Sequence, residues 1–73
     1  MALPTMTQVQ SSNVKALGYD PETRELHVEW HSGKVSVYAG VAPGTAEAAM
    51  SAPSVGGYVS RVIRGQHEHR YRE

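Results

Sequence analysis

Residues 25–38 read ELHVEWHSGKVSVY and decide the fold. Apolar and polar side chains alternate through the first seven positions, which is the pattern of a strand buried on one face. Ser32 and Gly33 follow as a turn pair, and Gly33 can adopt the positive φ that a two-residue hairpin loop requires. We therefore expect a β-hairpin in which His31 pairs with Lys34.

This register places the apolar side chains of both strands on one face of the sheet. A slip of one residue would set them opposite polar neighbours. The hairpin in this register is therefore the predicted anchor of the fold. The expected pairs are Trp30 with Val35, Val28 with Val37, and Leu26 with Ala39.

The flanking segments predict an α+β fold, with a three-stranded antiparallel β-meander followed by two short helices on one face (β-β-β-α-α). Residues 14–19 form the expected first strand, and residues 20–23 a type I turn in which Pro21 fixes φ. The apolar residues of this strand do not alternate cleanly, which a β-bulge or an edge position would accommodate.

Two helices are expected after the third strand. Thr45 is the expected N-cap of a helix over residues 46–50, which Pro53 ends. Ser54 is the expected N-cap of a second helix over residues 55–64, where apolar residues recur at helical spacing. The predicted core packs one sheet face against these helices. Its members are Leu26, Val28, Trp30, Val35, Val37, Met50, Val59, Val62 and Ile63.

The chain of 73 residues is expected to form one domain over residues 13–66, with a flexible polar lead over residues 1–12 and a charged tail over residues 67–73. It has no cysteine, so disulfides, thiolate zinc sites and thiol nucleophiles are excluded, which suits the cytoplasm. No signal peptide or membrane span is evident. Seven basic residues balance seven acidic ones, so net charge gives no case for nucleic-acid binding.

Two histidine clusters are the candidates for a metal site. One is the segment 67–69, and the other is His27, Glu29 and His31 on one strand face. Zinc requires three or four rigidly held ligands, so a surface role is the favoured interpretation of both. No phosphate-binding loop or nucleophile elbow is present. We expect no enzyme activity, no metal and no cofactor.

Two groups of residues are candidates for binding a partner. In the predicted register Tyr38 lies beside His27 and Ser36 on the polar face, where it could stack on a base, anchor a protein or be covered by the lead. Simple local packing is the favoured interpretation of this tyrosine. The second group is Tyr58, Arg61 and Arg64, which lie at helical spacing and form a basic and aromatic stripe. Composition does not separate protein from nucleic acid as the partner of these residues.

A series of short motifs in residues 11–67 resembles the KTSC domain family. The motifs are SSN at 11–13, LGYDP at 17–21, HSG at 31–33, APS at 52–54 and IRG at 63–65. The resemblance implies a domain that also occurs at the end of some lysyl-tRNA synthetases, and for which RNA binding has been suggested. A central Tyr-x-Tyr of the family falls on residues 36–38, where the first tyrosine is replaced by Ser36.

A free-standing chain of this size is also similar to a small transcription regulator of a lytic Xanthomonas phage. That similarity implies protein–protein binding to the large subunits of bacterial RNA polymerase in the host cytoplasm, inhibition of sigma-dependent initiation, and terminator read-through. RNA binding remains the alternative. We expect a monomer, because Lys15 and Lys34 disfavour edge-to-edge pairing.

Overall fold

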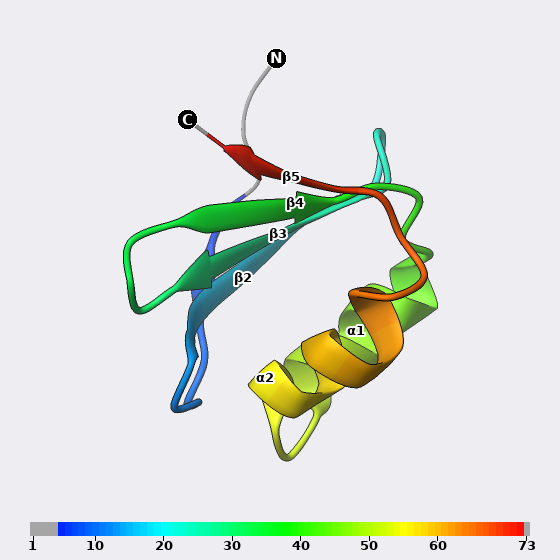
Figure 1. The fold of residues 1–73 in the computed structure, drawn as a ribbon. Helices are drawn as coiled ribbons and strands as arrows, with labels where there is room; N and C mark the ends of the chain where they lie inside the picture. The colour runs from blue at the N-terminus through cyan, green and yellow to red at the C-terminus, as the bar shows by residue number, and fades with distance from the viewer. Residues whose placement is uncertain (1–4, 73) are drawn as a thin grey trace.

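The computed structural model of the protein describes residues 5–72 and shows a sheet with helices packed on one of its faces (Figure 1). The five strands are antiparallel, and their order in space follows their order in the sequence. They are β1 (Thr7–Gln8), β2 (Val14–Asp20), β3 (Glu25–Trp30), β4 (Val35–Tyr38) and β5 (His69–Arg72). The helices are α1 (Pro43–Ser51) and α2 (Val55–Tyr58), and α2 continues into a π-helix, η1 (Val59–Ile63).

The predicted α+β class, an antiparallel sheet with two helices, is confirmed, but the prediction of three strands is wrong. Residues 7–8 of the expected lead pair with β2, and residues 69–72 of the expected tail pair with β4. Both segments are edge strands with mostly exposed side chains. They are held in the sheet by backbone hydrogen bonds and do not require an apolar face. Hydrophobic alternation therefore does not reveal them. Residues 1–4 of the lead and residue 73 of the tail lie outside the described residues.

The predicted hairpin between β3 and β4 is present, but its register is wrong by one residue. The Trp30 amide donates to the Lys34 carbonyl at 2.9 Å, which leaves a loop of three residues between them. Only Gly33 in this loop has a positive φ, at 96°. A two-residue type I′ loop would also force Ser32 into the left-handed region, which costs a residue with a Cβ about 1 kcal/mol or more. The longer loop avoids that cost.

The register shift exchanges the faces of the β4 side chains. Val28 lies opposite Ser36, and Leu26 lies opposite Tyr38, so Ser36 and Tyr38 face the helices. Val35 and Val37, predicted for the main core, lie on the outer face instead. The core between sheet and helices consists of Val14, Leu17, Leu26, Val28, Tyr38, Val41, Ala46, Ala49, Val55, Val59 and Ile63.

Two arginines of β5 cross the outer face of β4 to reach β3. Arg70 Nη2 lies 3.0 Å from a carboxylate oxygen of Glu25, and Arg72 Nη1 donates to His27 Nδ1 at 3.3 Å. Their alkyl stems lie on the strand face that carries the buried Val37. Burial, and secondarily the Arg72 charge, lowers the pKa of His27 below its ordinary value of 6.5, and the neutral ring is the form that can accept this hydrogen bond.

The second helix and its cap are confirmed, whereas the first helix begins earlier than predicted. Ser54 Oγ accepts from the Gly57 amide at 3.3 Å, as an N-cap does. Helix α1 begins at Pro43, not after Thr45, because the fixed φ of proline suits the first helical position. Of the two alternatives for the first strand, the bulge is present, between Val14 and Ala16 of β2, and β2 is not an edge strand. No helix within residues 5–72 has the length and apolar character needed to cross a bilayer.

Replacing Gly33 by alanine is expected to lower the free energy of unfolding by about 1 kcal/mol, because the left-handed backbone at this position disfavours a Cβ. Gly44→Ala is the matched control. Gly44 lies in the first turn of α1 with open space around it, so alanine there should stabilise by up to about 1 kcal/mol. Urea unfolding measures both, and equal destabilisation by the two variants would contradict the assigned turn.

Stability is expected to fall as the pH drops through and below about 6.5. The pKa of His27 is lowered in the folded protein, so the unfolded chain binds more protons in this window and acidification favours unfolding. His27→Gln, whose amide oxygen can still accept from Arg72, should flatten this dependence, whereas His31→Gln leaves His27 in place and should not. Urea unfolding at stepped pH tests this, and equal slopes for the wild type and H27Q would refute it.

Candidate functional site

An open groove lies beside the end of the β3–β4 hairpin on the helix-facing side of the sheet. It consists of two hollows that share Trp30, Ser32 and Arg64 as lining residues. The larger hollow measures about 490 Å³ and the smaller about 400 Å³. We call them the aromatic lobe and the polar lobe. The aromatic lobe is completed by Lys34, Ser36, Tyr38, His69 and Tyr71, and the polar lobe by Ser12, Asn13, His31 and Ser60.

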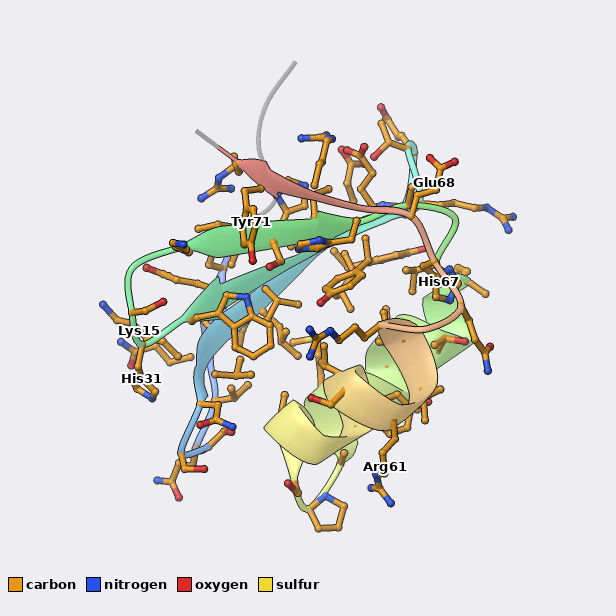
Figure 2. The ribbon with its side chains drawn as sticks, in the orientation of Figure 1. Lys15, His31, Arg61, His67, Glu68 and Tyr71 are labelled. Carbon is orange, nitrogen blue, oxygen red and sulfur yellow. The ribbon has the colours of Figure 1, made fainter. Side chains whose placement is uncertain are left out.

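Three aromatic rings form a ladder along the aromatic lobe. The ring centroids of Tyr38 and His69 are 5.0 Å apart, and those of His69 and Tyr71 are 4.7 Å apart in an edge-to-face arrangement. Tyr38 is buried at the base of the ladder, whereas Tyr71 is 57% exposed at its outer end. Figure 2 shows the Tyr71 side chain extending from β5 toward the helical side of the sheet. A large exposed aromatic at a cleft is a surface on which a planar group can stack.

Trp30 lines both lobes, and it contacts Ser36 of the aromatic lobe. The indole Nε1–H of Trp30 donates to Ser36 Oγ at 2.7 Å, which fixes the indole plane across the groove. Ser36 is itself buried, and it lines the aromatic lobe together with Trp30 and Tyr38. Burial raises the pKa of Tyr38 above its ordinary value of 10.0, partly opposed by the nearby Arg64 charge, so the phenol keeps its proton at neutral pH.

The charged residues that line the groove are all basic. Lys34 Nζ lies 5.3 Å from the centroid of the Tyr71 ring, as in a cation–π contact, and Arg64 contributes to both lobes. No carboxylate within residues 5–72 lines either lobe. The balanced net charge of the chain therefore conceals a local positive field on one face.

The π-helix positions Arg64 at this point. The Arg64 amide donates to the carbonyl of Val59, five residues earlier, at 2.8 Å. Such a widened turn shifts the direction of the residues that follow it, and it often occurs at functional sites. Sequence spacing alone places Arg64 in line with Arg61, because it assumes a regular α-helix.

The structure separates the first group of sequence candidates. Tyr38 and Ser36 lie on the helix-facing side within the groove, whereas His27 lies on the outer face under Arg72. All three side chains are buried, so none is an open stacking platform. The expectation that they share one polar face is wrong, because it depended on the register that the hairpin does not adopt.

The stripe of Tyr58, Arg61 and Arg64 is also divided. Arg64 lines the groove, but Arg61 projects from the other side of the helix, where its Nε donates to the Gly57 carbonyl at 3.1 Å (Figure 2). Tyr58 packs partly against the core. Of the six sequence candidates, Ser36, Tyr38 and Arg64 therefore meet at one place.

The sequence candidates omit most of the residues that line the groove, and four of those omitted belong to the aromatic lobe and have large side chains. Trp30 is predicted for the core, and His69 and Tyr71 for a tail. The missed signal was the alternation of aromatic and basic side chains in residues 69–72, which is a strand pattern without apolar aliphatic residues. The fourth residue is Lys34.

The two histidine clusters do not assemble a metal site. Residues 5–72 contain no group of three or more potential ligands that could hold an ion. His67 instead contacts the Ala39 carbonyl through Nδ1 at 3.0 Å, and His31 contacts the Ser11 carbonyl through Nε2 at 3.0 Å. Both rings thus help to fix the loops that flank the sheet.

These features define a class of protein, namely a small α+β domain with a sequentially ordered five-stranded sheet. The KTSC domain model matches residues 10–67, and the chain belongs to the KTSC domain family. An uncharacterized protein of Stutzerimonas stutzeri strain A1501 is 41% identical over 59 residues, which cover 81% of this chain and 83% of that protein. The crystal structure of a KTSC domain protein from Yersinia pestis superposes with a TM-score of 0.91 at 30% identity, covering 97% of this chain and 100% of that chain. The predicted family is thereby confirmed.

The exposed groove residues are expected to contribute little to folding. Tyr71→Ala and Arg64→Ala should each change the free energy of unfolding by less than about 0.5 kcal/mol, because both side chains are exposed. Leu17→Ala, which empties a fully buried site, should cost about 2–5 kcal/mol. Urea unfolding measures all three. A loss near that of the core variant at Tyr71 or Arg64 would assign the residue a structural role.

Proposed function

We propose that the protein is a non-catalytic module that binds single-stranded RNA in the groove between the β3–β4 hairpin and the end of η1. The observation that carries the proposal is the combination of an aromatic ladder with two basic side chains in one open hollow. Bases stack on exposed aromatic rings without regard to sequence, and arginine and lysine contact the phosphates.

The shape of the groove favours a single strand over a duplex. An accessible stacking ring is of use only to a base whose face is free, and duplex bases cover one another. The hydroxyl and amide groups of Ser12, Asn13 and Ser60 in the polar lobe supply hydrogen-bond partners for ribose 2′-hydroxyls and base edges. RNA binding, which has been suggested for KTSC domains, is consistent with the same ligand.

The protein is expected to bind an oligouridylate of about 12 nucleotides with an affinity that falls as salt is raised. Two phosphate contacts, at Lys34 and Arg64, predict a slope of log K against log salt of about −1.4, since each contributes about 0.7. Tyr71→Ala should weaken binding by about 5- to 150-fold, which corresponds to the loss of one stacked base, and Tyr71→Phe should retain it. Fluorescence anisotropy of labelled RNA measures these values.

Arg61→Ala is the matched control, because it removes one charge from the same helix on the side away from the groove. It should change the affinity by no more than about twofold if the groove is the site. An equal loss of RNA affinity in the Arg61 and Arg64 variants would indicate non-specific electrostatic attraction and would contradict a defined binding site. Undetectable RNA binding at low salt would refute the proposal.

A second candidate function is binding to bacterial RNA polymerase, with effects on initiation and termination. The observation that favours it is the exposed edge of β5, the last strand of the sheet. In an antiparallel pair of strands, only every second residue forms backbone hydrogen bonds with the neighbouring strand. Glu68 bonds to Ala39 in this way, so the backbone groups of His69 and Tyr71 point away from β4. These outward groups can bind an extended peptide by β-augmentation.

A pull-down from bacterial lysate, with and without nuclease, separates the two candidates. Recovery of large polymerase subunits after nuclease treatment supports the second candidate. Loss of polymerase together with the nucleic acid, or recovery of RNA alone, supports the first.

A further inference from the structure

We infer that the groove binds two successive nucleotides, with the phosphate between them on Arg64. This inference rests on the proposed RNA-binding function and deepens it by assigning each lobe one nucleotide. The starting observation is that two separate hollows adjoin at a shared boundary of Trp30, Ser32 and Arg64.

The two lobes differ in chemistry, which suits two different contacts. The aromatic lobe contains the exposed Tyr71 ring and the adjacent His69 ring, so a base there is held by stacking. The polar lobe offers Asn13 and three serine hydroxyls, so a nucleotide there is held mainly by hydrogen bonds. A single nucleotide occupies one lobe and leaves the contacts of the other unused.

Arg64 is placed to hold the connecting phosphate. It is the one cationic residue common to both lobes, and within residues 5–72 no carboxylate lies at ion-pair distance from it. A guanidinium can present two N–H groups to two phosphate oxygens at once. Lys34 lies beside Tyr71 in the aromatic lobe, where it can meet a phosphate on the other side of that nucleotide.

Trp30 provides a direct probe, because it is the single tryptophan of the chain and lines both lobes. Its indole N–H gives one cross-peak in a nitrogen–proton NMR spectrum, and the shift of that peak reports weak binding without a label. The ligands are uridine 5′-monophosphate and 5′-phosphorylated uridine oligomers of two, three and four nucleotides.

The expected result is a single step in affinity. The dinucleotide should bind about tenfold or more tightly than the mononucleotide, whereas each further nucleotide should add less than about threefold. Arg64→Ala should remove most of the step between one and two nucleotides, and Arg64→Lys should restore part of it. Tyr71→Ala should weaken the mononucleotide and the dinucleotide by the same factor, because the aromatic lobe is occupied in both.

Three outcomes would overturn the inference. These are an affinity that rises evenly through four nucleotides, an Arg64→Ala effect as large on the mononucleotide as on the dinucleotide, and a loss of the step in Arg61→Ala. If a long oligouridylate binds but the affinity shows no step at two nucleotides, the two-nucleotide site is refuted and the RNA-binding function is retained. If no RNA binds, both the site and the function are refuted. Well-dispersed amide spectra of each variant show that it is folded.

Discussion

The left-handed backbone of Gly33 is the constraint on which the rest of the structure depends. With one positive φ available, the hairpin closes through three residues, and this loop length sets the register of β4 against β3. The register then decides which β4 side chains meet the helices. Ser36 and Tyr38 face them, and both side chains line the aromatic lobe of the groove. In the alternative register, two valines would take those places.

The outer face of the sheet supports the groove from behind. Arg70 and Arg72 bridge β5 to Glu25 and His27 of β3 across the intervening strand. Because side chains alternate along β5, these two bridges hold in place the strand whose other face carries Tyr71 into the aromatic lobe. The arginines that look like a charged tail in the sequence thus have structural contacts, whereas Tyr71 between them is exposed in the groove.

The sequence predicts the elements that depend on local chemistry and misses those that depend on pairing. The alternation in β3, the Asp20 turn and the Ser54 cap were all predictable from residue type and spacing, and the structure has each of them. The hairpin register was not predictable in this way, because Ser-Gly fits both a two-residue and a three-residue loop. Strand β5 was not predictable from local sequence either, because it is extended only through its pairing with β4, which lies more than 30 residues away. The groove could not be predicted for both reasons, because its lining depends on the observed register of β4 and on the presence of β5.

The pairing of β5 with β4 also determines when this domain can finish folding. Val35 pairs with Arg72, so the contact spans both helices and half of the chain. The hairpins and the helices contain mostly local contacts and can form early, whereas the last strand joins through contacts of high sequence separation, which are slow to close. During synthesis, residues 69–72 leave the ribosome after all the elements they pack against. The nascent domain therefore has a four-stranded sheet with an exposed β4 edge until residues 69–72 emerge, and the groove wall that carries His69 and Tyr71 forms after the rest of the sheet.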